Sequence, residues 1–253
     1  MHEFSNRRPF GLAARSRRWL IAGLLLAVFV KLMAFDHALS LEFSRQSPQV
    51  EAVFTAVTQW GMSDWILYPS AALVAATALA ARFGRPRLVR LAALEWLWAT
   101  GFVFVGVGLP SLVANIVKRL VGRGRPEVFD TVGSLAFHPF AGNFLYESFP
   151  SGHTTTAFSL AMVAAFLWPR AIWLGVAYAV AIGASRLILG VHYPTDVFAG
   201  MLLGLFGAYA VRNYFASRHW GFERQIDGRI GRRPFVASRR LMAKRRRQPS
   251  AAT

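Results

Sequence analysis

Three short clusters of basic, hydroxyl and imidazole side chains stand out in a chain that is otherwise strongly apolar. In chain order they are Lys118 with Arg125-Pro126, then Pro150-Ser151-Gly152-His153, and then Ser185-Arg186 with His192 and Asp196. Each cluster lies at the end of a long apolar segment. We expect the three clusters to meet at one end of a helical bundle, because facing helices in such folds build binding sites from their side chains.

The cations of these clusters suit an anion that carries more than one charge. Lys118, Arg125 and Arg186 are positively charged, and Arg presents a planar fork of N–H donors that matches the oxygens of a phosphate. Ser151 and Gly152 lie where a helix is expected to begin, so their backbone N–H groups would face the same anion at the positive end of the helix dipole. The pattern predicts a phosphate site.

The two imidazoles supply groups that could react with such a phosphate. His153 and His192 can each take or give a proton near neutral pH, and a neutral imidazole can attack phosphorus. Asp196 follows His192 by one helical turn. A carboxylate bonded to the Nδ1–H of His192 would leave Nε2 free as the nucleophile and would stabilise the positive charge that the ring acquires.

A metal site is the alternative use of the same side chains. His153, His192 and Asp196, with His138, carry common ligand groups. Three neighbouring cations would repel a divalent ion, however, so the sequence predicts no metal and no cofactor. Cations and backbone dipoles would stabilise the transition state instead.

The composition indicates a membrane protein. The 253 residues are 55% hydrophobic and include 21 Phe and 8 Trp, which excludes a disordered chain. The absence of Cys excludes disulfide scaffolds and thiolate metal sites. Six apolar segments approach the length that a helix needs to cross about 30 Å of hydrocarbon. They are residues 19–35, 65–81, 91–117, 151–168, 171–189 and 197–211.

The arrangement of apolar residues favours helices. They run continuously within the six segments and do not alternate with polar residues as the strands of a barrel would. Residues 48–60 carry apolar side chains on one helical face only, which predicts a helix lying on the membrane surface. The predicted fold is therefore all-α, a polytopic membrane protein with six transmembrane helices and an interfacial helix between the first two.

The basic residues predict the orientation of the chain. Most of the 29 Lys and Arg precede the first span, separate the second from the third, or follow the last. By the positive-inside rule these segments face the cytoplasm. We therefore predict a basic cytoplasmic N-terminus (1–18), a membrane domain (19–211) and a basic cytoplasmic tail (212–253), with the three clusters on the opposite, periplasmic face.

A net charge of +17 could also indicate nucleic-acid binding. A basic tail after a membrane span is more simply a contact with anionic lipid headgroups, so no nucleic-acid partner is predicted. The basic N-terminus and first apolar segment are similar to a signal peptide, but Lys31 and Asp36 interrupt the path to a cleavage site and favour an uncleaved span. Arg119 and Arg123 are expected to anchor a helix end at the headgroups.

Taken together, the three clusters resemble the signature of the type 2 phosphatidic acid phosphatase family, lipid phosphatases related to the vanadium haloperoxidases. All fixed positions of the signature are present in order, and the resemblance covers residues 19–211. It implies that His192 forms a phosphohistidine, that Asp196 holds this ring, and that His153 protonates the leaving group and then activates water. It also implies a metal-independent phosphate cradle formed by Lys118, Arg125, Ser151, Gly152 and Arg186.

This resemblance implies a phosphatase that hydrolyses a lipid phosphomonoester or diphosphate at the periplasmic face of a bacterial inner membrane. The family's substrates include lipid A phosphates, undecaprenyl diphosphate, phosphatidylglycerol phosphate and phosphatidic acid. The segment Gly61-Met62-Ser63-Asp64-Trp65 resembles one in lipid A phosphatases. Two alternatives stay open: a phosphotransferase that passes the phosphoryl group to a second lipid or sugar, and a non-catalytic anion carrier. The sequence sets no oligomeric state.

Overall fold

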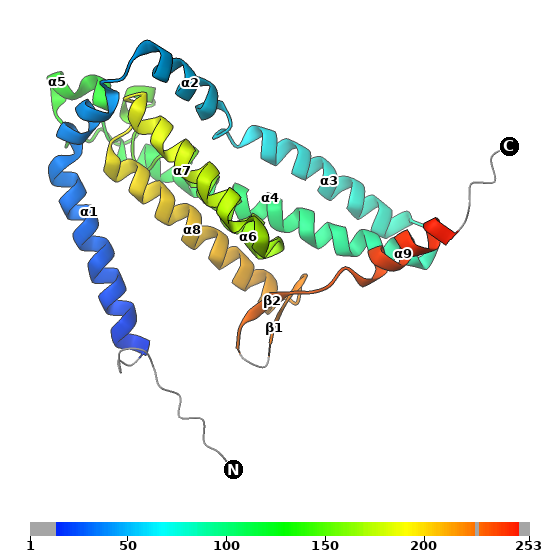
Figure 1. The fold of residues 1–253 in the computed structure, drawn as a ribbon. Helices are drawn as coiled ribbons and strands as arrows, with labels where there is room; N and C mark the ends of the chain where they lie inside the picture. The colour runs from blue at the N-terminus through cyan, green and yellow to red at the C-terminus, as the bar shows by residue number, and fades with distance from the viewer. Residues whose placement is uncertain (1–13, 226–227, 248–253) are drawn as a thin grey trace.

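The computed structural model describes residues 14–225 and 228–247, which form a bundle of long helices followed by a small hairpin and a last helix (Figure 1). The bundle contains α1 (Ala14–Ser44), α2 (Pro48–Gln59), α3 (Asp64–Phe83), α4 (Arg87–Val121), α5 (Phe129–Val132), α6 (Gly152–Leu167), α7 (Ile172–Ile188) and α8 (Pro194–Ser217). The chain continues with β1 (Phe222–Arg224), β2 (Ile230–Arg232) and α9 (Val236–Arg247).

Every segment predicted to span the membrane is helical. Among the described residues, five helical segments are long and apolar enough to cross a bilayer, namely Arg18–Ser44, Pro48–Phe83, Arg87–Val121, Pro169–Ile188 and Pro194–Ser217. The remaining predicted span, α6, is apolar but has only 16 residues. Its length of about 24 Å falls short of the roughly 30 Å of a hydrocarbon core. The structure is that of a helical membrane protein with five spans by length and one shorter apolar helix.

The segment predicted to lie on the membrane surface forms α2. Its start is fixed by Ser47, whose side chain accepts a hydrogen bond from the Val50 N–H at 3.5 Å, and by Pro48 in the first turn. A turn at Gly61 separates α2 from α3, and α2 packs against α7. Because α2 and α3 together make one of the span-length segments, the interfacial position of α2 remains a prediction.

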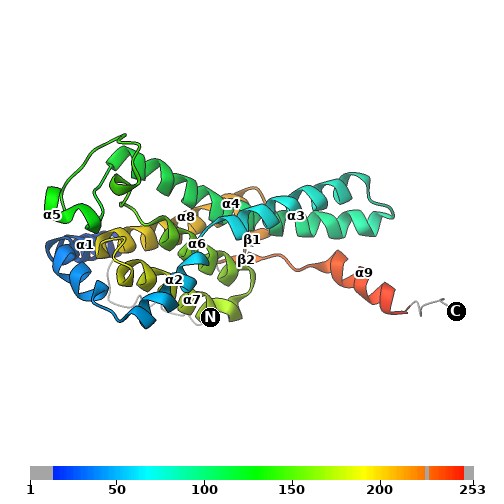
Figure 2. The same ribbon diagram turned by 90° about the horizontal axis from the view of Figure 1, so that it is seen from above.

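Helix α6 lies in the middle of the bundle, in contact with α4, α7 and α8 (Figure 1, Figure 2). Helix α3 lies along α4, and α1 contacts α8 and α7. The outer helices expose large apolar side chains, for example Trp19, Leu24 and Leu73. An apolar exterior of this extent is expected where lipid surrounds the helices.

The close approach of α8 to α6 depends on two glycines. A Cβ atom on Gly204 would lie 2.6 Å from the carbonyl oxygen of Thr155, and one on Gly200 would lie 2.5 Å from that of Ser151. The two helices therefore touch through their backbones. As a result, the Ser151 N–H at the start of α6 donates to the Asp196 carbonyl in the first turn of α8, at 3.0 Å.

The all-α prediction was wrong for residues 222–224 and 230–232, which pair as antiparallel strands with Phe222 opposite Arg232. Phe222 is buried, and its ring meets that of Phe102 in a T-shaped contact with centroids 4.7 Å apart. Strands of three residues are too short to show an alternating pattern in the sequence. The hairpin is held by its contact with the core of the bundle.

The predicted basic tail is in part a folded element. Helix α9 lies against α4, and the carboxylate of Glu95 accepts the backbone N–H groups of Ala237 and Ser238 at 2.8 and 2.9 Å. Of the two predicted cytoplasmic segments, residues 1–13, 226–227 and 248–253 lie outside the described residues. The described part of the tail lies at the end of the bundle away from α2 and α5 (Figure 1).

Candidate active site

The three predicted clusters come together at one end of the bundle. Helices α4 and α7 end there, and α6 and α8 begin there (Figure 1). His192, which is 1% exposed, lies within electrostatic reach of Arg125, Lys118, Arg186 and His153. The convergence that we predicted from sequence is therefore present in the structure.

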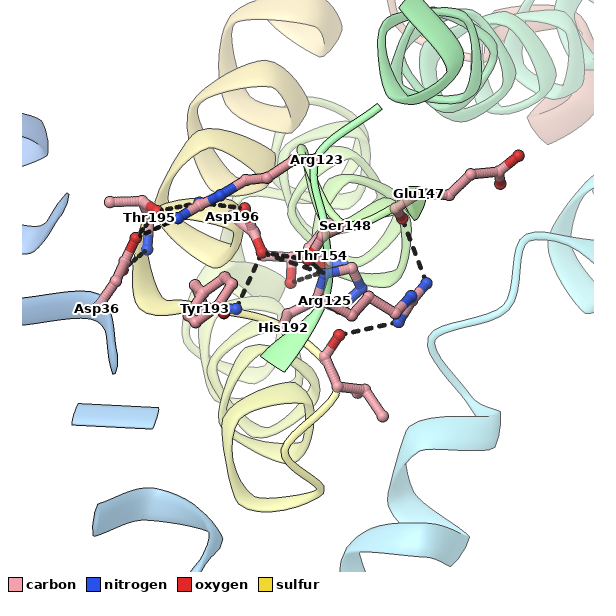
Figure 3. Close-up of polar contacts among 12 residues, drawn as sticks. Asp36, Arg123, Arg125, Glu147, Ser148, Thr154, His192, Tyr193, Thr195 and Asp196 are labelled. Atoms are coloured by element: carbon pink, nitrogen blue, oxygen red, sulfur yellow. Dashed lines mark hydrogen bonds and ion pairs between the residues drawn. The ribbon is translucent and has the colours of Figure 1, made fainter. Parts of the chain in front are cut away.

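His192 and Asp196 face each other, with a serine beside both. The Nδ1 atom of His192 lies 3.6 Å from Oδ2 of Asp196, a distance too long for a direct hydrogen bond. Ser148 donates to the same carboxylate oxygen at 2.6 Å, and its Oγ lies 3.4 Å from the His192 Nδ1 (Figure 3). The Tyr193 N–H also donates to Oδ2, at 2.9 Å. The carboxylate is thus fixed beside the imidazole.

The surroundings of His192 keep its imidazole neutral. Burial lowers the pKa of His192 well below its usual 6.5, and the positive charges of Arg125, Lys118 and Arg186 lower it further. A neutral imidazole has a free lone pair on one nitrogen, which nucleophilic attack requires.

Arg123 does not anchor a helix end at the headgroups, and that prediction was wrong. It is 3% exposed and bridges two buried carboxylates, with Nη1 2.7 Å from Asp196 Oδ1 and Nη2 2.8 Å from Asp36 Oδ2 (Figure 3). Burial alone would lower the pKa of Arg123, but the two carboxylates outweigh this effect and raise it. The sequence could not reveal this role, because both partners lie far from Arg123 along the chain.

Arg125, predicted to bind phosphate, is occupied in large part by backbone carbonyls. Its guanidinium donates to Phe144, Val191 and Glu147 at 2.9, 2.8 and 3.3 Å, which ties the loop before α6 to the segment that carries His192. Burial lowers the pKa of Arg125 to about 10, so it is charged at neutral pH. Three of its five N–H groups make these bonds.

Arg186 retains a donor for a ligand. Its Nη1 donates to the Thr58 hydroxyl of α2, whereas its buried Nε meets no acceptor among the described residues. A buried donor without a partner is costly, and an anion in the site would satisfy it. Because α2 supplies Thr58, the segment between the first two predicted spans helps to build the site.

The start of α6 differs from the prediction in one respect. The Ser151 N–H is bound by the Asp196 carbonyl and the Ser151 side chain accepts from the Thr154 hydroxyl at 2.9 Å, so Ser151 caps and positions the helix. The prediction that its N–H is free for an anion was wrong. Gly152 lies beside Lys118, since a Cβ on Gly152 would be 3.5 Å from the Lys118 ammonium.

A polar cavity of about 200 Å³ opens beside these residues. Its walls are formed by Gly61, Met62, Ser63, Asp64, Ser111, Asn115, Lys118, Gly152, His153 and Thr156. The turn at Gly61 touches the catalytic candidate directly, because a Cβ on Gly61 would lie 2.9 Å from the His153 ring. The segment that we singled out at residues 61–65 therefore contributes four residues to the cavity that His153 lines.

Sequence reasoning missed several members of this site: Asp36, Arg123, Ser148, Tyr193 and Thr195. Only Asp36 carried a signal in the sequence, because an acid at the end of an apolar span is costly unless it is paired.

His138, which we considered as a possible metal ligand, contacts Tyr146, with ring centroids 4.5 Å apart. Within the described residues, no three His, Cys, Asp or Glu side chains are grouped as metal ligands.

Comparisons with known proteins agree on one family. Residues 99–220 match the model of the PAP2 superfamily. A lipid A 1-phosphatase of Rhizobium johnstonii is 30% identical to this chain, over 85% of this chain and 93% of the relative. A lipid A 1-phosphatase of Rhizobium etli is 33% identical, over 70% of this chain and 76% of the relative. A crystal structure of a transmembrane PAP2 type phosphatidylglycerolphosphate phosphatase from Bacillus subtilis is similar with a TM-score of 0.51 and 25% identity, covering 75% of this chain and 93% of that one.

Proposed function

Since the chain belongs to the PAP2 superfamily, we propose that it is a membrane lipid phosphatase that works through a phosphohistidine on His192. The observation that carries the proposal is a buried, neutral imidazole within reach of three cations and backed by a fixed carboxylate. A phosphate ester drawn in by Lys118 and Arg186 would meet the free Nε2 of His192.

The proposed reaction has two steps. In the first, which starts with the phosphate ester bound and His153 protonated, the Nε2 lone pair of His192 forms a bond to phosphorus. The bond from phosphorus to the leaving oxygen breaks, and that oxygen takes the proton from the His153 imidazolium, which becomes neutral. In the second, His153 accepts a proton from water, the water oxygen attacks phosphorus, and the P–N bond breaks to release inorganic phosphate. Asp196 stabilises the ring while it carries positive charge.

We place this site at the periplasmic face of a bacterial inner membrane, with six spans and both termini in the cytoplasm. The polybasic segments around Arg87 and Arg212 lie at the end of the bundle opposite the three clusters, as the positive-inside rule requires. Helix α6 is short for a span, but α4, α7 and α8 surround it, so it need not meet lipid along its whole length. We also place α2 at the outer interface.

Among the candidate substrates, we favour a phosphate monoester of a lipid A-type saccharide. The two Rhizobium relatives are lipid A 1-phosphatases. In the cavity beside His153, the side chains of Ser63, Asp64 and Asn115 can bind sugar hydroxyls. The Asp64 carboxylate would repel the second phosphate of a diphosphate substrate such as undecaprenyl diphosphate.

A phosphate-release assay tests the proposal. The purified protein in mixed micelles is offered lipid A, undecaprenyl diphosphate, phosphatidylglycerol phosphate and phosphatidic acid in turn. We expect free phosphate from lipid A first, no release by His192→Asn, and unchanged lipid binding by that variant. An acid-labile phosphoryl label on the wild type, absent from the variant, would identify the intermediate.

Other outcomes would contradict specific parts of the proposal. Transfer of the phosphoryl group to an added lipid or sugar, without free phosphate, would indicate a phosphotransferase. Undiminished release by His192→Asn would exclude the phosphohistidine. We expect full activity in the presence of a chelator, and a requirement for an added divalent ion would overturn the metal-independent mechanism.

A further inference from the structure

Asp36 is an unusual residue of α1. The helix exposes most of its apolar side chains, including Trp19, Leu24 and Phe35, yet Asp36 has no exposed surface. Burying a carboxylate is unfavourable unless charges and hydrogen bonds compensate it. Neither the proposed mechanism nor the family signature assigns a role to this residue.

Asp36 is fully compensated by groups that lead to the catalytic carboxylate. Its Oδ2 accepts from Arg123 Nη2 at 2.8 Å and from the Thr195 hydroxyl, and its Oδ1 accepts from the Thr195 N–H at 3.0 Å (Figure 3). Arg123 in turn donates through Nη1 to Asp196 Oδ1 and to the Thr195 hydroxyl, both at 2.7 Å. One continuous network therefore joins α1 to the partner of His192.

The balance of charge in this network matters for the reaction. Asp36, Arg123 and Asp196 carry two negative charges and one positive charge, so the buried cluster is negative overall. Without Asp36, Arg123 would neutralise Asp196 alone, and the cluster beside His192 would carry no net charge. A phosphorylated imidazole is cationic, and a nearby negative charge stabilises it most strongly where water is excluded.

We propose that Asp36 is a positioning residue for phosphoryl transfer, which acts through Arg123 to orient Asp196 and to keep a net negative charge beside His192. This inference rests on the proposed function of the site. It assigns to the first span a part in catalysis, although α1 contributes nothing to the three sequence clusters.

The alternative is that the ion pair only fastens α1 to α8. A structural role would weaken every property of the site together, whereas a positioning role affects the states in which His192 is bonded to phosphorus or its analogue. Orthovanadate mimics such a state by bonding to a nucleophile, while inorganic phosphate occupies the cradle without a bond to His192. The two anions therefore separate the two roles.

The experiment compares wild type, Asp36→Asn and the control Glu42→Gln. Glu42 is an exposed acid on the same helix, paired loosely with Arg45 at 3.7 Å. For Asp36→Asn we expect kcat and orthovanadate affinity each to fall by about tenfold or more. A tenfold loss is the effect of shifting the pKa of a neighbouring group by about one unit, which is typical of removing a nearby buried charge. KM and phosphate affinity should change less than twofold, and Glu42→Gln should match wild type.

Several results would overturn the inference. One is an unchanged kcat in Asp36→Asn. The other is a fall in phosphate affinity as large as the fall in orthovanadate affinity, together with a rise in KM of the same size. If Asp36→Asn does not fold, Thr195→Val removes the hydroxyl between Arg123 and Asp36 but keeps their ion pair, and it should show the same pattern on a smaller scale. Wild-type protein that neither releases phosphate nor binds orthovanadate would instead refute the proposed function.

Discussion

At the residue scale, the proposed reaction depends on the protonation state of His192. Burial and the neighbouring cations Arg125, Lys118 and Arg186 hold its pKa well below 6.5. The neutral form therefore persists as the pH falls through 6.5 and is lost only when the pH reaches the lower value of the folded protein. His192, the proposed nucleophile, therefore keeps a free lone pair in mildly acidic solution.

We therefore expect the acid limb of kcat/KM, which reports the free enzyme, to lie below pH 6.5. The profile is measured with a phosphate monoester and corrected for the substrate's own ionisation. Arg125→Gln removes one positive charge near the imidazole, so the limb should move to higher pH in this variant. A limb at or above pH 6.5 in the wild type would contradict the environment described for His192.

Asp64 provides a prediction about specificity. Its carboxylate lines the cavity beside His153 and would repel an anionic leaving group. We expect Asp64→Asn to raise the ratio of diphosphate to monophosphate turnover by roughly two- to fivefold, the size of an exposed charge interaction. Asp130→Asn, an exposed acid outside the cavity, is the control. Equal ratios in the two variants would remove Asp64 from substrate selection.

The residues that the sequence did and did not reveal differ in the range of their interactions. His153, His192 and Asp196 were found because each lies in a short cluster of chemically related neighbours. Asp36 and Arg123 are 87 positions apart and meet only in the folded chain. Spacing alone also could not separate Arg123, which pairs with carboxylates, from Arg125, which binds backbone carbonyls.

At the scale of helices, the site depends on the contact between α6 and α8. A methyl group on Gly204 would lie 2.6 Å from the Thr155 carbonyl oxygen and 2.9 Å from the Ser159 nitrogen. These are backbone atoms, so relief requires the helices to separate. Because His153 lies in the first turn of α6 and Asp196 in the first turn of α8, any separation would alter the geometry of the proposed catalytic groups.

We expect Gly204→Ala to lower the free energy of unfolding by about 1–3 kcal/mol, as overpacking does, and to reduce kcat. Gly101→Ala is the matched control, because no atom lies within 4 Å of its added Cβ and alanine favours helix. Thermal unfolding in detergent compares the two. A Gly204→Ala protein as stable as Gly101→Ala would show that the helices tolerate a wider spacing.

Hydropathy predicted where the helices lie but not where they end. The segment predicted at residues 197–211 is α8, Pro194–Ser217, which begins three residues earlier because Pro194 suits a first helical turn and Asp196 accepts the Tyr193 N–H. Helix α4 extends to Val121, where Gly122 adopts a left-handed conformation with φ of 60°. Such helix ends are set by local hydrogen bonds. An average of hydropathy over a window of residues does not detect these bonds.

At the scale of the whole molecule, charge and chemistry are separated along the bundle. The three clusters lie at one end, and α9 with its basic residues lies toward the other (Figure 1). Sequence reasoning anticipated this separation from the distribution of Arg and Lys. It did not anticipate that Glu95 binds the start of α9, because capping of one helix by a residue 142 positions away leaves no local pattern.

The proposed orientation can be tested because the chain has no native Cys that would give a background signal. Thr131→Cys places a thiol at an exposed position of α5, at the same end of the bundle as the site, and Ser217→Cys places one on the exposed C-terminal end of α8. In intact cells with a permeable outer membrane, a membrane-impermeant maleimide should label Thr131→Cys at once and Ser217→Cys only after the inner membrane is disrupted. The cysteine-free parent is the control. The reverse order would place the site in the cytoplasm and contradict the orientation predicted by the positive-inside rule.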